Sequence, residues 1–242
     1  MAISAIDTSA VISGIKLAAA QTGVDFDYLL AEATVESGLD PAAAAPTSSA
    51  RGLYQFTSGT WLDTVRKHGA EHGLGWAADA LKAGADPTTR AAILDLRRDP
   101  GASASMAAAL ASDNGKSLEH RPGRAAGATD LYLAHFLGAG GAARFLKARD
   151  ADPAASASGA VLPAAAHANA GVFTAKGGRE RSLAEVYDRF SAKLGATSSN
   201  PIVARAEPQT TGNPVPRTGN FMPVDATRAA RTAYLLLAEF GA

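Results

Sequence analysis

Apolar residues in this chain recur at intervals of three and four, and long runs of valine and isoleucine at period two are absent. The first pattern lines one face of a helix, whereas a large sheet needs the second. Hydrophobic residues make up 47% of the 242 residues and aromatic residues only 6%. Alanine supplies a large share of the hydrophobic residues, which suits helices packed closely through small side chains. The sequence therefore predicts an all-α fold.

The balance of charges and the absence of cysteine argue against several kinds of binding partner and exclude chemistry that needs a thiol. Lys+Arg 23 balance Asp+Glu 23, so composition gives no support to a nucleic acid or an acidic membrane as the main partner. Cys 0 excludes disulfides, thiol catalysis and cysteine metal sites. No apolar run approaches the roughly 20 residues that a membrane-spanning helix needs. The N-terminus lacks the basic and apolar regions of a signal peptide and is more typical of a helix.

Composition also divides the chain into four parts. Residues 1–24 are expected to form an N-terminal packing helix and residues 25–195 the main helical domain. Residues 196–224, rich in Thr, Ser, Asn, Pro and Gly, are expected to be a flexible linker. Residues 225–242 then read as a C-terminal helix whose apolar residues either dock on the same domain or bind another protein.

Capping residues and glycines predict where the helices lie. Asp25 caps a helix that ends at Gly38, so Glu36 falls in its last turn. Asp40-Pro41 is expected to start a short helix, and Asp86-Pro87 a longer one. The other expected helices cover 9–21, 58–68, 103–114, a segment ending near Leu137, a segment through Phe145 and Leu146 after a Gly138–Gly141 turn, and a segment beginning at Ser182.

Two histidines, His68 and His72, stand four residues apart, a spacing that on a helix can bind a metal ion. Gly69 and Gly73 weaken the helix that would align them. We therefore expect no metal site, and nothing in the sequence calls for an organic cofactor.

Four segments, in this order, resemble the soluble lytic transglycosylases, a superfamily shared with goose-type lysozyme. They are Glu36-Ser37, Leu39-Asp40-Pro41, Gly52-Leu53-Tyr54-Gln55-Phe56 and Ala134–Gly141. The family pattern is a Glu-Ser pair at a helix end, an aromatic-Asp/Asn-Pro turn, a serine-containing loop and Gly-Leu-x-Gln. The similarity covers roughly residues 25–194. GLYQFTSGTW, LYLAHFLGAGGAARFL and SLAEVYDRF look closest to an alphaproteobacterial branch, some members of which serve flagellar assembly.

The resemblance implies a lysozyme-like helical lobe with a cleft for peptidoglycan glycan strands, and a periplasmic location. It also implies that residues 25–195 are a catalytic domain in which Glu36 is the single general acid/base, with no cofactor. Family precedent adds that the acetamide of N-acetylmuramic acid, in place of a second carboxylate, attacks its own anomeric carbon. A flagellar rod protein or another envelope-assembly protein is the expected partner of the C-terminal tail.

Three departures from the family pattern bear on the site. Leu39 stands where the family has an aromatic residue, so one hydrophobic wall is smaller. The interval from Glu36 to Gln55 is one residue longer than in the best-known members, which leaves open whether Thr47, Ser48 or Ser49 replaces the family serine. His135 occupies the position of the tyrosine in the usual Ala-Tyr-Asn-Ala-Gly motif.

The resemblance and the chemistry of the side chains together give the expected substrate contacts. These are Ser37, Ser48, Ser49, Gly52, Tyr54, Gln55, Tyr132, His135 and Tyr187. Each has a plainer interpretation. A helix-terminal serine commonly bonds its own backbone, tyrosines and a histidine on apolar faces commonly belong to the core, and a loop glutamine is commonly an exposed amide. Gly52 is expected to allow a positive φ or a close backbone approach.

Two further glutamates have structural explanations. Glu32 lies one helical turn before Glu36, where its charge can raise the pKa of Glu36, but we expect it to be solvated. Glu185 fits a Ser-x-x-Glu capping box. The main prediction is a lytic transglycosylase. The alternatives are a lysozyme-like hydrolase and a glycan-binding assembly protein that has kept the cleft but lost turnover.

Overall fold

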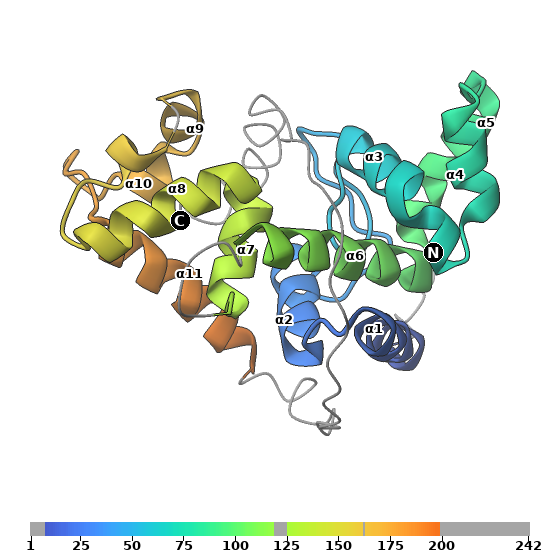
Figure 1. Ribbon diagram of the computed structural model, residues 1–242, viewed down its shortest axis with the longest axis horizontal. Helices are drawn as coiled ribbons and strands as arrows, with labels where there is room; N and C mark the ends of the chain where they lie inside the picture. The colour runs from blue at the N-terminus through green and yellow to red at the C-terminus, as the bar shows by residue number, and fades with distance from the viewer. Residues whose placement is uncertain (1–7, 119–124, 162, 199–242) are drawn as a thin grey trace.

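The computed structural model describes residues 8–118, 125–161 and 163–198, and within these ranges the chain is all-α, as predicted, without a β-strand (Figure 1). None of the helices in these ranges is long and apolar enough to cross a membrane. The helices of eight or more residues are α1 (Thr8–Thr22), α2 (Phe26–Ser37), α3 (Ser58–His68), α4 (Gly75–Lys82), α5 (Pro87–Asp95), α6 (Pro100–Leu118), α7 (Ala128–Leu137), α8 (Ala139–Ala151) and α11 (Leu183–Ser198). The shorter turns are η1 (Gly69–His72), η2 (Leu96–Arg98), η3 (Ser158–Ala160), α9 (Pro163–Ala168) and α10 (Ala170–Phe173).

Helix α6 runs through the middle of the molecule, with α1 and α2 beneath it in Figure 1, α3 to α5 at one end, and α7, α8 and α11 at the other. Buried alanines along α6 let neighbouring helices approach closely. Helix α1 packs on α6 through Val11, Ile15 and Ala18, which belong to the same hydrophobic core as the other helices. Leu17 lies off this face and is exposed. The helix predicted over residues 9–21 is therefore confirmed.

The capping aspartates fix the helix starts as the sequence predicts. Asp25 accepts a hydrogen bond from Tyr28 N, and Asp86 from the backbone N–H groups of Thr88 and Thr89. The helix predicted over 103–114 is present as α6 but is longer than expected, because Pro100 opens it and it continues to Leu118. Asp99 Oδ1 accepts from Ala102 N at 2.7 Å, and proline suits the first helical position, where its missing N–H has no partner to lose.

Two turn predictions were wrong. Asp40-Pro41 starts no helix, because Asp40 Oδ1 accepts from Ala42 N and closes a single turn. The turn predicted over Gly138–Gly141 is confined to Gly138, since α8 begins at Ala139. A Cβ on Gly141 would lie 2.9 Å from Leu137 Cβ, so this glycine permits close packing between α7 and α8. Helix α4, which begins at a glycine without a side-chain cap, was not predicted.

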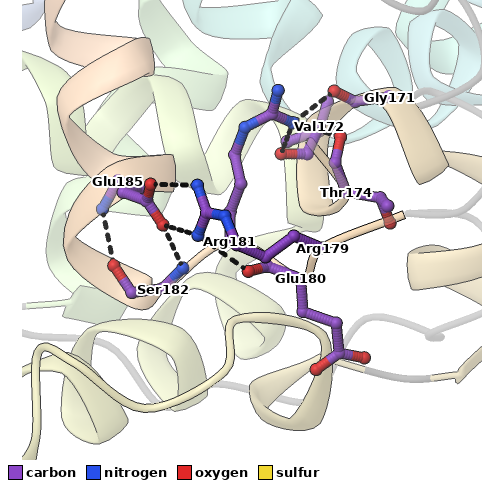
Figure 2. Close-up of polar contacts among 8 residues, drawn as sticks. All are labelled: Gly171, Val172, Thr174, Arg179, Glu180, Arg181, Ser182 and Glu185. Atoms are coloured by element: carbon purple, nitrogen blue, oxygen red, sulfur yellow. Dashed lines mark hydrogen bonds and ion pairs between the residues drawn. The ribbon is translucent and has the colours of Figure 1, made fainter. Parts of the chain in front are cut away.

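A network of polar groups anchors the start of α11 (Figure 2). The capping box predicted from the sequence is confirmed: Glu185 accepts from Ser182 N at 2.8 Å, and Ser182 Oγ accepts from Glu185 N at 3.1 Å. Arg179 donates two further hydrogen bonds to Glu185. Arg181 Nη1 donates to three backbone carbonyl oxygens, those of residues 171, 172 and 174.

The predicted linker begins later than expected, because α11 continues to Ser198. The rest of the predicted linker to residue 224 and the predicted helix 225–242 lie outside the described residues.

Candidate active site

Glu36 lies in the last turn of α2, where the sequence places it. Gly38 ends the helix with a φ of 63°, and its N–H bonds to carbonyls of the last turn. The Glu36 side chain is 5% exposed, although the residue as a whole is half-buried. The carboxyl group is thus largely withdrawn from water.

Two residues of α7 face this carboxyl group. The Tyr132 hydroxyl donates a hydrogen bond to Glu36 Oε1 at 3.3 Å. His135 Nε2 lies 3.7 Å from the same oxygen. The two rings come from successive turns of α7 and are nearly parallel, with an interplanar angle of 5°. The structure therefore brings three predicted site residues together.

Glu32 belongs to the same cluster, and the expectation that it is solvated was wrong. It is 3% exposed, and its Oε1 lies 3.0 Å from His135 Nδ1. Its other oxygen, Oε2, is buried and has no hydrogen-bond partner within the described part of the chain. The signal in the sequence was the spacing of four residues from Glu36, but burial depends on α6, the loop before α3 and His135, which lie far away in the sequence.

Burial controls the protonation of these groups. It raises the pKa of Glu32 to about 8, helped by the nearby charge of Glu36 and opposed by a hydrogen bond from Tyr28. Burial, with the positive charge of Lys193, lowers the pKa of His135 to about 4. Burial and the two glutamates also raise the pKa of Tyr132, so its hydroxyl remains a donor. At neutral pH, Glu32 and His135 are therefore both expected to be uncharged.

A small cavity of about 10 Å³ adjoins Glu32 and His135 between α2, α6, α7 and the loop before α3. This is about the space of one water molecule, so a sugar ring does not enter it. The lining residues are Tyr28, Glu32, Tyr54, Phe56, Ala107, Leu110, Ala111, Asn114 and His135.

Two residues that were predicted to contact substrate, Ser37 and Tyr54, instead form hydrogen bonds between α2 and the loop before α3. Ser37 Oγ donates to Leu53 O at 2.8 Å and to Ala33 O at 3.1 Å. The Tyr54 hydroxyl donates to Leu29 O at 3.0 Å, and its ring is buried. These hydroxyl protons are used by the backbone. A direct substrate contact by either residue stays a prediction.

Gln55 is also buried in this loop, at 8% exposure, so the plainer interpretation as an exposed amide was wrong. Its Nε2 donates to Gly52 O at 2.8 Å, and its φ is 45°. Its neighbours Tyr54 and Phe56 are core residues, which fixes the direction of the amide side chain. Leu39, at the smaller wall position, has a φ of 68° and is likewise buried.

Gly52 meets both predicted conditions. Its φ is 81°, and an added Cβ would overlap the carbonyl oxygen of Arg97. The Arg97 side chain is 7% exposed and holds the loop from the other side, with Nη1 donating to Ser49 O at 2.6 Å and Phe56 O at 3.2 Å. This arginine was not singled out in the sequence, because nothing local marks it as buried.

The remaining predicted contacts serve local structure in the described chain. Ser48 Oγ accepts from Ala50 N, and exposed Ser49 Oγ accepts from Ser58 N. The Tyr187 hydroxyl donates to Asp130 Oδ1 at 3.0 Å. The Arg149 guanidinium lies 3.7 Å from the centre of the Tyr187 ring. One face of this ring is therefore covered, and a role as a sugar-stacking platform remains a prediction for its other face.

The cluster at Glu36 combines a proton donor or acceptor with a phenol and an imidazole, which is suited to general acid–base chemistry. No group of three or more metal-ligating side chains occurs in the residues that the structure describes. A scan against models of known protein families finds none that matches the chain.

Proposed function

We propose that the protein is a lytic transglycosylase that cleaves β-1,4 bonds between N-acetylmuramic acid and N-acetylglucosamine, with Glu36 as general acid and then general base. The supporting observation is the environment of Glu36: a carboxyl group 5% exposed, at a helix end, hydrogen-bonded by the Tyr132 hydroxyl. A carboxyl group withdrawn from water at a helix end is the kind of group that can deliver a proton to a glycosidic leaving oxygen.

In the proposed reaction, Glu36 acts first as the acid and then as the base. Protonated Glu36 gives its proton to the glycosidic oxygen while the bond to the anomeric carbon breaks. The acetamide oxygen of the same muramic residue attacks the anomeric carbon and stabilises the developing positive charge. The Glu36 carboxylate then takes the proton of the C6 hydroxyl, whose oxygen bonds to the anomeric carbon and releases the acetamide. The product is a 1,6-anhydro sugar, and Glu36 regains its proton.

The position of Glu32 favours this route over a two-carboxylate mechanism that uses Glu32. A second catalytic carboxylate has to reach the sugar ring from the side opposite the acid, roughly 5 to 9.5 Å from it. Glu32 instead lies one turn earlier on the same helix, buried and 3.0 Å from His135. It is therefore not placed as a nucleophile or as a base for water.

Mass spectrometry of digested peptidoglycan tests the proposal. The wild type is expected to release muropeptides lighter by one water than hydrolysis products. Glu36→Gln is expected to lower turnover by about 10²- to 10⁴-fold. Glu71→Gln, at an exposed glutamate in η1, is the matched control and should keep full activity.

Three other results would redirect the assignment. Products that carry the added water indicate the lysozyme-like hydrolase. Equal turnover in wild type and Glu36→Gln removes Glu36 from the mechanism. Glycan binding without turnover in either protein favours the non-catalytic assembly protein.

The proposed substrate carries two further proposals with it. Peptidoglycan places the working compartment in the periplasm. A flagellar rod protein or another envelope-assembly protein remains the proposed partner of the C-terminal tail, which lies outside the described residues. Truncation after Ser198, the end of α11, should then abolish partner binding without changing the thermal stability of the domain. Loss of thermal stability with partner binding retained would reject this partner role.

A further inference from the structure

We propose that Glu32 and His135 are positioning residues for Glu36, and that one proton is shared along the row from Glu32 through the imidazole to Glu36. The inference rests on the proposed role of Glu36 as general acid. It adds a second carboxyl group that never touches the sugar.

The geometry of His135 carries the proposal. Its Nδ1 lies 3.0 Å from Glu32 Oε1, and its Nε2 lies 3.7 Å from Glu36 Oε1. Each ring nitrogen therefore faces a different carboxyl group, and both carboxyl groups come from one face of α2. The 3.7 Å separation is longer than a hydrogen bond, so proton transfer on that side follows a small side-chain rotation, as is common in unliganded sites.

The surroundings of Glu32 favour a neutral carboxyl group over a buried ion. Its Oε2 is buried without a hydrogen-bond partner within the described chain, and an ionised oxygen there would lack compensation. The groups that act on this row electrostatically come from four elements. They are Tyr28 on α2, Tyr54 in the following loop, Tyr132 on α7 and Lys193 on α11. The three tyrosines are uncharged at neutral pH, and Lys193 opposes a charged imidazolium.

The proton transfer balances without water. It starts with protonated Glu32, neutral His135 carrying hydrogen on Nε2, and ionised Glu36. The Glu32 proton moves to Nδ1 while the Nε2 proton moves to Glu36. One O–H and one N–H bond break, one of each forms, and the imidazole stays neutral in its other tautomer. Glu36 is thereby returned to its acid form. Glu32 becomes the carboxylate, and its Oε1 then accepts a hydrogen bond from the new Nδ1–H group of His135, 3.0 Å away.

Two consequences follow for Glu36. The reserve proton on Glu32 keeps Glu36 in its acid form toward higher pH. Once this proton has moved, the negative charge of Glu32 disfavours ionisation of Glu36. The alkaline limit of activity is therefore expected to depend on Glu32, and to depend on it through His135.

Nitrogen NMR of the histidine rings tests the bridge without any need for turnover. In the wild type, the His135 signals are expected to shift with pH, with a midpoint at the pH where the row loses its shared proton. In Glu32→Gln and in Glu36→Gln, the midpoint should move by about one pH unit or more, because either change removes one of the two carboxyl groups. His167, exposed on α9, provides a reference signal that should not move.

A His135 midpoint that is the same in all three proteins overturns the inference and leaves the proposed function untouched. Conversely, the NMR result stands if the protein proves to bind glycan without cleaving it. If Glu32→Gln does not fold, as judged by thermal melting, Glu36→Gln still tests the bridge, from the other carboxyl group.

A kinetic double-mutant cycle then separates a bridge from simple charge repulsion. Glu32→Gln is expected to lower the alkaline pKa of the kcat/KM profile by about one pH unit in the wild-type background. In a His135→Gln background the same change should have little further effect. An equal shift in both backgrounds means that Glu32 acts directly on Glu36 through its charge, which rejects the role of His135.

Discussion

Glu32 and Glu185 are glutamates in two regions of the molecule, and they differ in both burial and partners. Glu32, between α2 and α7, has a side chain 4% exposed and one oxygen without a hydrogen-bond partner in the described chain. Glu185, at the start of α11, has a side chain 42% exposed and accepts hydrogen bonds from Arg179 and from Ser182 N (Figure 2). The pKa of Glu32 is raised to about 8 by burial, whereas hydrogen bonds from Arg179 lower that of Glu185 to about 2.

The difference shows that a hydrogen-bonded, exposed carboxylate holds its charge, whereas a buried carboxyl group without enough partners holds its proton. At the start of α11, Arg179 and Glu185 are hydrogen-bonded to each other, and Glu185 also caps the helix. Both side chains therefore keep their charges across the physiological pH range. Arg181 follows the same principle, with one nitrogen shared among three carbonyl oxygens. Glu32, by contrast, is buried with one oxygen that has no hydrogen-bond partner in the described chain, so its protonation responds to its surroundings.

The largest effect that sharpens this comparison is the pH dependence of stability in Glu32→Gln. Between about pH 4.5 and pH 8, Glu32 binds a proton in the folded protein but not in the unfolded chain. The wild type therefore loses stability as pH rises, by about 1.4 kcal/mol per pH unit relative to the variant. Denaturant unfolding at several pH values should find the variant more stable at pH 8 by roughly 2 to 4 kcal/mol, with the gap closing toward pH 5.

His135 also shapes the stability curve of the wild type. Its lowered pKa makes the folded state bind fewer protons than the unfolded chain between about pH 4 and pH 6.5. Stability from this group rises with pH and roughly cancels the loss from Glu32 over that interval. A gap between wild type and variant that stays constant with pH would contradict a protonated, buried Glu32.

A smaller effect on stability is expected when Arg181, in the polar network before α11, is replaced. Arg181→Met keeps much of the apolar stem but leaves the carbonyl oxygens of residues 171, 172 and 174 without their shared donor. Loss of partners by partly buried carbonyls is expected to cost about 1 to 3 kcal/mol in the free energy of unfolding. Because guanidinium does not titrate in this range, the cost should be the same at pH 5 and pH 8. If the loss of stability in Arg181→Met changes with pH, the hydrogen bonds of Arg181 are coupled to a titrating group.

Much of the fold was predictable because its signals are local. Asp25 and Gly38 bound α2, Asp86 bounds α5, and Ser182 with Glu185 starts α11, each through contacts within four residues. The errors arose where the same residue types serve another purpose. Gly141 allows helix packing rather than a turn, and Pro100 opens α6 before the start that was predicted at residue 103.

The candidate site was predictable in part, and for the same reason. The position of Glu36 at a helix end is a local property. The burial of Glu32, the contacts of His135 and the anchoring by Arg97 depend on segments far apart in sequence, which no spacing within α2 reveals. Gln55 is the intermediate case, since its place in the loop was expected but its burial was not.

The smallest expected effect has the opposite sign, and it comes from Glu185→Gln. The folded pKa of Glu185 lies below its unfolded value, so its stabilising contribution is present above about pH 4.5 and is lost as pH falls toward 2. The variant should therefore be slightly less stable than wild type at neutral pH, and the gap should close on acidification. Added salt should also shrink this gap, because Arg179 is 62% exposed and exposed pairs are screened. The gap for Glu32→Gln should resist salt, because that carboxyl group is buried and uncharged. If the two gaps respond alike to salt, the environments of these glutamates do not differ in the way that their contacts indicate.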